Sequence, residues 1–281
     1  MSLEKTIEDL KSDDVNIRKE AIEQLVGVND ESIIDDLIIA TTDENAQVRF
    51  KAATILGNFG DVAFEKLANH YNKAEGKDKR FLAFALKEAN NPKAIDYFVD
   101  AVEDEDFGVR KVAIRALGEL KAEDKLDEIS KGLDDEDWGV RLAAIYAFGD
   151  IATPESIELI KKARRNEKDE DFKKSCKKAL KKAEKVLKAK EKGETISSTL
   201  PMARIKEFEK TNVQKAIKEY EKYVEEGQVK DAPYKRLVIL YRKNDDYDNE
   251  VRVLNKAIEV FGSKKPEKVD YFQKRLDKLV G

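Results

Sequence analysis

The sequence predicts an all-α protein built largely from stacked helical hairpins. A basic residue that follows an aliphatic one and precedes an alanine by three places recurs about every 31 residues. Charged residues make up 40% of the 281 residues, against 13 glycines and 5 prolines. That composition is typical of surface-rich helical arrays rather than of sheets. Apolar residues also recur at three- and four-residue spacings, the period of a helix with one buried face.

The basic residue defines the repeat unit. Successive copies lie 31, 31, 30, 31 and 32 residues apart, at Arg18, Arg49, Arg80, Arg110, Arg141 and Lys173. An acidic or polar residue such as Asp106 precedes each apolar run, where it caps the helix N-terminus. A glycine or asparagine closes that helix and a second, shorter amphipathic helix follows. We therefore expect about six hairpins over residues 1–190, which bury one continuous core by stacking.

Two copies carry the motif in full. Residues 104–118 and 135–149 both read D-E-D-x-G-V-R-x-x-A-x-x-A-L/F-G. This motif resembles HEAT repeats of the short, phycobilisome-lyase-like type, over roughly residues 2–190. The resemblance implies a right-handed α-solenoid whose second helices line the concave surface. It also implies that the arginines form a structural ladder with acidic residues between neighbouring repeats, with rungs at Arg18, Arg49, Arg80, Arg110 and Arg141.

Two copies depart from the motif. In the third, Lys79 stands where the others have an aliphatic residue, and the sixth has neither the arginine nor the closing glycine. We interpret the sixth copy as a cap on the end of the stack. The third is a place where the stack could bend.

A different module is expected after the repeats. Residues 191–200 have little apolar periodicity and are predicted to be a linker, and residues 201–281 are again helical but have no 31-residue pattern. The spacing of Tyr234, Leu237, Tyr241, Tyr247 and Ala257 resembles one tetratricopeptide repeat. The resemblance is imperfect, because Val238, Glu250 and Gly262 replace the glycine, alanine and proline that this family prefers. The sequence therefore predicts a small tetratricopeptide-like helical module.

The residue inventory predicts no enzyme, metal or cofactor. The chain has one histidine, one cysteine and no glycine-rich phosphate loop, which excludes many catalytic designs. His70 is interpreted as a surface or inter-repeat residue, and Cys176 as a small core residue in the place of the repeat alanine. Apolar stretches fall far short of the ~20 residues of a membrane span, so a cytoplasmic protein is expected.

Charge is distributed unevenly and points to a macromolecular partner. Residues 1–150 carry 20 basic and 34 acidic side chains, and residues 151–281 carry 34 and 24, which gives net charges of -14 and +10. Alignment at the repeat period places one carboxylate per second helix at an equivalent position: Asp35, Glu65, Asp96, Asp127 and Glu158. The next position contains Tyr97, a candidate anchor, and Glu128.

The predicted function is a non-enzymatic scaffold or adaptor whose acidic concave face binds a basic protein segment. One alternative is that the carboxylates only keep the array soluble. A second is a nucleic-acid-associated protein that uses residues 161–190, where 14 basic and 5 acidic residues lie on one helix. A lyase-like accessory protein is a third, because bilin lyases contain repeats of this type; the resemblance alone does not transfer their activity.

Overall fold

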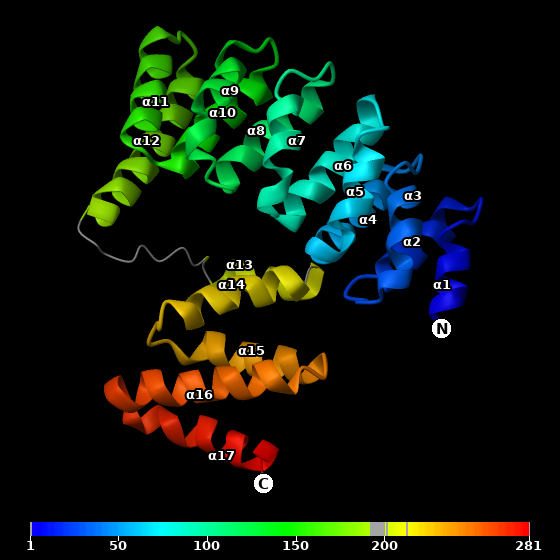
Figure 1. Ribbon diagram of the computed structural model, residues 1–281, viewed down its shortest axis with the longest axis vertical. Coiled ribbons are helices and arrows are strands. Elements are labelled where there is room, and N and C mark those ends of the chain that lie inside the picture. The colour runs from blue at the N-terminus through cyan, green and yellow to red at the C-terminus, as the bar shows by residue number, and fades with distance from the viewer. Residues whose placement is uncertain (1, 192–199, 201, 212, 281) are drawn as a thin grey trace. The chain divides into compact units, whose positions relative to one another are not determined.

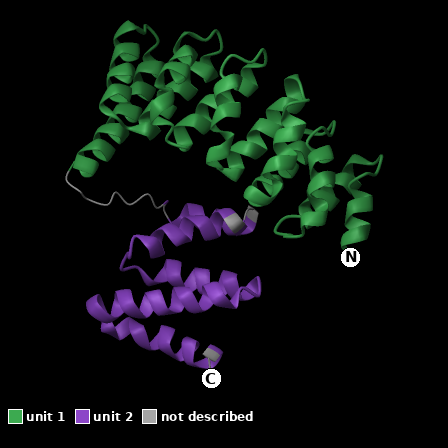
Figure 2. Ribbon diagram, viewed as in Figure 1, with its two compact units in different colours: residues 1–194 green, residues 195–281 purple. Residues whose placement is uncertain are grey.

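The computed structural model describes the chain except residues 1, 192–199, 201, 212 and 281. Every regular element in the described part is a helix. Contacts divide the chain into two compact units, residues 1–194 and 195–281 (Figure 2). The linker predicted at 191–200 lies almost entirely outside the described residues.

Unit 1 is an α-solenoid, as the sequence predicts (Figure 1). Its helices are α1 (Leu3–Asp9), α2 (Val15–Gln24), α3 (Ile34–Ala40), α4 (Ala46–Asn58), α5 (Asp61–Tyr71), α6 (Gly76–Ala89), α7 (Ile95–Ala101), α8 (Phe107–Glu119), α9 (Leu126–Lys131), α10 (Trp138–Ile151), α11 (Pro154–Asn166) and α12 (Glu170–Glu191). Short 3₁₀ turns lead into α3, α7 and α9. Predicted N-caps are present: the side chains of Asp14, Asp106 and Asp137 accept hydrogen bonds from the first turns of α2, α8 and α10.

Two layers of helices build the stack. We call the helices that carry the recurrent basic residue the ladder helices (α2, α4, α6, α8, α10 and α12) and the others the companion helices (α1, α3, α5, α7, α9 and α11). Among the companion helices, most ladder helices pack on the one that precedes them, as α4 does on α3 and α8 on α7. The order of helices in the sequence pattern predicts instead that each pairs with the helix that follows. The difference arises because the acidic turn, such as residues 102–106, reverses the chain inside a hairpin and brings two apolar faces together.

Small residues bring the ladder helices close together. A Cβ atom at Gly118 would lie 2.4 Å from the Cα atom of Ala147 on the next ladder helix, and one at Gly149 would lie 3.1 Å from the Cβ atom of Ala179. Consecutive ladder helices accordingly pack directly side by side, whereas companion helices contact one another far less. When a two-layer stack curves, the more closely spaced layer is the inner one. The expectation that the second helices, which are these companion helices, line the concave surface is therefore wrong.

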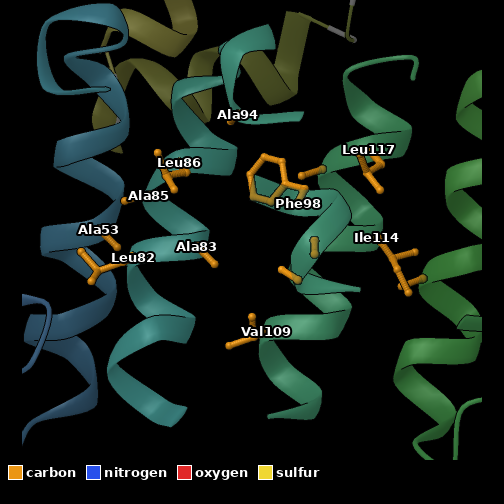
Figure 3. Close-up of a cluster of buried hydrophobic side chains, with 14 of the residues drawn as sticks. Ala53, Leu82, Ala83, Ala85, Leu86, Ala94, Phe98, Val109, Ile114 and Leu117 are labelled. Atoms are coloured by element: carbon orange, nitrogen blue, oxygen red, sulfur yellow. The ribbon is translucent and has the colours of Figure 1, made fainter. Parts of the chain in front are cut away.

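One apolar core runs between the layers of unit 1. Phe98 of α7, Leu86 of α6 and Leu117 of α8 are fully buried in it, and Figure 3 shows them in this cluster. Cys176 of α12 is also fully buried, in the place that the repeat gives to alanine. The stack therefore shares its core from hairpin to hairpin, as repeat architectures require.

Unit 2 is a second helical array with its own core. Its helices are α13 (Met202–Thr211), α14 (Val213–Glu225), α15 (Asp231–Lys243), α16 (Tyr247–Lys264) and α17 (Val269–Val280), and each packs on the next. Tyr234, Phe261 and Phe272 cluster at its centre, and the last two rings stack 5.5 Å apart. Glu250, which replaces the alanine of the tetratricopeptide pattern, is fully buried and paired with Arg242 and Arg275. The tetratricopeptide resemblance stays a prediction.

Candidate protein-interaction surface

The predicted ladder joins neighbouring hairpins at two clear rungs. The Nε atom of Arg18 donates to a carboxylate oxygen of Asp43 at 2.7 Å, and its Nη1 atom donates to the carbonyl oxygens of Ser12 and Asp13. Arg110 makes the same set of bonds, with Asp135 at 2.7 Å and with two carbonyls of its own turn. These carboxylates raise the pKa of both guanidinium groups. The structural role expected for these two arginines is confirmed.

In the third repeat, both Lys79 and Arg80 pair with the acidic turn of the next hairpin. The Nζ atom of Lys79 lies 2.6 Å from a carboxylate oxygen of Asp104, 25 residues further along the chain, the same separation as in the regular rungs. Arg80 pairs with Asp106, the N-cap of α8 in the same turn, and lies over the Phe107 ring. Arg80 therefore joins neighbouring hairpins as predicted, but Lys79 holds the carboxylate that lies 25 residues further along, as the arginines of the regular rungs do.

All five carboxylates of the predicted row are exposed on companion helices α3, α5, α7, α9 and α11. Asp35 pairs with Lys66 at 2.8 Å, and Glu158 pairs with Lys161 at 2.7 Å, which lowers the pKa of Glu158. The central three, Glu65, Asp96 and Asp127, make no hydrogen bond or ion pair within the described residues. We call these five residues the acidic row.

The neighbouring position is less exposed than the acidic row. The Tyr97 ring is half-buried and packs edge-on against Phe64 and Tyr71, with ring centroids 6.1 Å away in each case. Glu128 is likewise half-buried. Tyr97 therefore stabilises the contact between hairpins and offers only part of its ring to a partner.

A hollow of about 490 Å³ opens at the N-terminal end of the acidic row. Asp36, Asp43 and Glu44 line it together with Lys11, Arg18 and Ile39, which is 62% exposed. These carboxylates are already paired, Asp36 with Lys11 and the other two with Arg18, so the hollow offers a partner mainly the apolar side chain of Ile39.

Two residues singled out for their chemistry have ordinary surroundings. His70 is exposed at the end of α5. Cys176 is buried, and burial raises the pKa of its thiol to about 11, so the thiol stays protonated at neutral pH. Where the structure describes the chain, no three His, Cys, Asp or Glu residues are grouped so that they could hold a metal ion. None of the described helices is both long and apolar enough to cross a membrane.

A further set of exposed residues lies on the ladder helices. The sequence pattern does not single these residues out. Phe50, Phe107, Trp138 and Tyr146 are each at least 38% exposed. The repeat motif leaves their positions unspecified, so it does not mark them as either core or surface. A signal that could have identified two of them is the eight-residue spacing of Trp138 and Tyr146, which places both on one face of α10, away from its buried alanines.

A HEAT-repeat family model matches residues 3–80, 64–136 and 109–181, more than half of the chain. Curated proteins contain no match to the sequence. Among solved structures, the complex of CpcE and CpcF of phycocyanin lyase from Nostoc sp. PCC7120 is 20% identical, with 53% of this chain and 99% of that chain covered and a TM-score of 0.50. An engineered protein is 21% identical, covers 66% of this chain and 98% of its own, and has a TM-score of 0.44. Human deoxyhypusine hydroxylase in complex with glycerol is 18% identical, with 65% and 84% covered and a TM-score of 0.35. The likeness to the phycocyanin lyase complex, at 20% identity, shows a shared fold and carries no activity over to this chain. On the match of the family model, this chain belongs to the HEAT-repeat family.

Proposed function

We propose that this protein is a non-enzymatic scaffold whose acidic row binds a basic segment of another protein. The observation that carries the proposal is the exposure of five carboxylates, one per hairpin, of which the central three have no partner within the described residues. A regular row of unpaired charges fits a partner with regularly spaced lysines or arginines. The membership in a family of repeat solenoids supports an interaction role in general.

The strength of such an interface depends on several contacts acting together. A single exposed ion pair contributes only ~0.2–1 kcal/mol, and salt screens it further. Three free carboxylates together, with the hollow at Ile39, offer more contact than any one residue. The negative charge of residues 1–150 also speeds the encounter with a basic partner.

The test is charge reversal in the middle of the row. Asp96→Lys combined with Asp127→Lys should weaken the binding of a fluorescein-labelled lysine–serine peptide roughly fivefold to tenfold at low salt, because two attractions become repulsions. Fluorescence anisotropy measures the affinity. The matched control is Glu20→Lys combined with Glu184→Lys, which makes the same change in net charge on ladder helices and should bind nearly as the parent does.

Equal affinities for all three proteins would contradict the proposal. In that case the carboxylates serve solubility, and the Asp96→Lys, Asp127→Lys variant should precipitate at a lower concentration than the control. This measurement separates a scaffold that binds a partner from an array whose carboxylates only keep it soluble.

Nucleic acid binding is the second candidate, and the lysine face of α12 favours it. Lys177, Lys181 and Lys185 are exposed there and have no ion pair within the described residues. Lysine-rich helices contact phosphate backbones through charge alone. A steeply salt-dependent mobility shift of a DNA duplex or a transfer RNA, abolished by reversal of these three charges, would favour this function over the scaffold.

A further inference from the structure

We propose that the ladder helices form a second docking surface, and that its occupant is an acidic protein segment that carries apolar side chains. This surface lies on the opposite layer from the acidic row and has the opposite chemistry. The inference goes beyond the proposed function, because a scaffold with both surfaces connects a basic partner to an acidic one.

The surface is built from residues four apart on neighbouring ladder helices. Side chains at i, i+4 and i+8 share one face of a helix. These exposed or half-buried stripes are Phe107, Lys111 and Arg115 on α8; Trp138, Leu142 and Tyr146 on α10; and Lys174, Lys178 and Lys182 on α12. Because α8, α10 and α12 pack directly side by side, the three stripes form one continuous surface.

Exposed aromatic rings give this surface its binding potential. Trp138 is 45% exposed and Phe107 is 44% exposed, at equivalent first positions of α10 and α8. Phe50 extends the apolar surface onto α4, where its ring lies 5.2 Å from that of Phe84 on α6. Large aromatic side chains are enriched at the centres of protein interfaces, because each buries much area with few rotatable bonds.

The charge of the surface is positive although residues 1–150 are strongly acidic. Lys111 and Lys178 are exposed and have no ion pair among the residues that the structure describes. Arg115 and Lys182 both pair with the carboxylate of Asp150, which is only 8% exposed. Arg115 also pairs with Glu119. The positive charge left free for an acidic side chain of the partner is therefore that of Lys111 and Lys178.

A hollow lies at the centre of these cations. It has a volume of about 280 Å³ and is lined by Arg115, Tyr146, Gly149, Asp150, Ala179 and Lys182. Gly149 keeps its floor open, since a Cβ atom there would already lie 3.1 Å from that of Ala179. The hollow can take one side chain, with its carboxylate directed at Arg115 and Lys182 and its stem against Tyr146.

Two observations favour a protein segment over a nucleic acid. The guanidinium groups of Arg115 and Arg80 lie 5.6 Å and 4.9 Å from the ring centroids of Tyr146 and Phe107, so one face of each ring is already covered and is not free for base stacking. Carboxylates of Glu119 and Asp150 interrupt the cations and would repel a continuous phosphate backbone. An acidic segment with leucine or phenylalanine can instead place its carboxylates on the cations and its apolar side chains on the rings.

Trp138 makes the test direct, because it is the only tryptophan of the chain. The full-length protein is titrated with a peptide of glutamate and leucine, and the emission of Trp138 is recorded. We expect a blue shift as the indole is buried, with a parallel rise in the anisotropy of the labelled peptide. A glutamate–serine peptide of the same charge should bind more weakly, since it has no apolar side chains to bury.

Charge reversal identifies the cations involved. Lys111→Glu combined with Lys178→Glu should weaken the binding of the glutamate–leucine peptide roughly tenfold. Lys73→Glu combined with Lys162→Glu makes the same charge change at exposed positions in the turn before α6 and on α11, and should leave the affinity close to that of the parent. Circular dichroism checks that each variant keeps its helix content, and the wild-type titration needs no variant at all.

Three results would overturn the inference. One is an unchanged Trp138 emission at saturating glutamate–leucine peptide. Another is a shift of that emission by a DNA duplex but not by the peptide, which would make the surface a nucleic-acid site. A third is concentration-dependent self-association that Lys111→Glu with Lys178→Glu abolishes while the peptide does not bind, which would make the occupant a second copy. The proposed function is tested separately. Binding of the lysine–serine peptide without a shift of the Trp138 emission would support the acidic row, whichever of these three results is obtained.

Discussion

The Nζ atom of Lys79 lies 2.6 Å from a carboxylate oxygen of Asp104, which belongs to the next hairpin of the stack. Arg18 and Asp43 are paired across the same 25 residues. A lysine has a single cationic head in place of the planar fork of arginine, so it holds one oxygen where arginine holds two. The ladder thus continues through the irregular third repeat, where Arg80 adds a second pair with Asp106 of the same turn.

The arginine of the second repeat, Arg49, has no carboxylate partner among the described residues. Arg49 donates to two carbonyls of its own turn, but its buried Nε atom has no partner, and Ala74 stands where other turns have an aspartate. Ala74→Asp should supply the acceptor and raise the free energy of unfolding by about 1 kcal/mol. Thermal unfolding followed by circular dichroism measures the gain. Ala74→Asn, which adds an acceptor without a full charge, should give less, and a lower melting temperature for Ala74→Asp would refute the missing-rung explanation.

Gly118 should resist substitution because of its neighbour. A Cβ atom there would lie 2.4 Å from the backbone of Ala147, which cannot move without displacing α10. Gly118→Ala is expected to lower the free energy of unfolding by about 1–3 kcal/mol. Gly262→Ala is the control, since a Cβ atom at that helical position has nothing within 4 Å and alanine favours the helix. Equal melting temperatures for the two variants would show that the ladder helices are not closely packed at this point.

The rung at Asp135 predicts a dependence of stability on pH. The hydrogen bond from Arg110 holds the pKa of Asp135 below its ordinary value of 3.8. A depressed pKa in the folded state means that the charged carboxylate stabilises the fold at neutral pH, and that this contribution is lost as the pH falls below 3.8 and through the folded pKa. Asp135→Asn should therefore be less stable than the parent at pH 7, by about 1 kcal/mol for a partly buried pair.

Urea unfolding at several pH values tests this prediction. The free energies of unfolding of parent and Asp135→Asn should converge as the solution becomes more acidic, because protonation removes the same interaction that the substitution removes. A gap that stays constant with pH would contradict the assigned role of the charge.

Cys176 should be protected from alkylation while the chain is folded. Burial raises its thiol pKa from 9.0 to about 11, so the fraction of thiolate near neutral pH is roughly a hundredfold lower than for a free cysteine. Iodoacetamide labelling followed by mass spectrometry should be slow in buffer and fast in urea. Cys176→Ala, the residue that the repeat prefers, should keep the fold, and fast labelling of the native protein would show that α10 and α11 do not cover this side of α12.

Some of the site was within reach of the sequence. The acidic row was found because repeats place equivalent residues at equal intervals, and exposure of Asp96 and Asp127 follows from the helical period. Spacing along the chain does not show in which layer Asp96 and Asp127 lie, because it predicts that each ladder helix pairs with the companion helix that follows and not with the one that precedes it. Trp138 was missed for a related reason: an aromatic residue inside a repeat motif has the same composition signal whether it faces the core or the solvent.

The sequence by itself determined the all-α class, the repeat period, the buried alanine and leucine faces and the acidic row. Those features depend on contacts within one helix or on the chemistry of a residue type, and both can be read along the chain. Only the tertiary structure decided which helices pair, which layer is closely spaced, and that Lys79 joins Arg80 in pairing with the next hairpin. Those outcomes depend on how side chains of separate helices fit together, where a shift of one residue in register changes every partner.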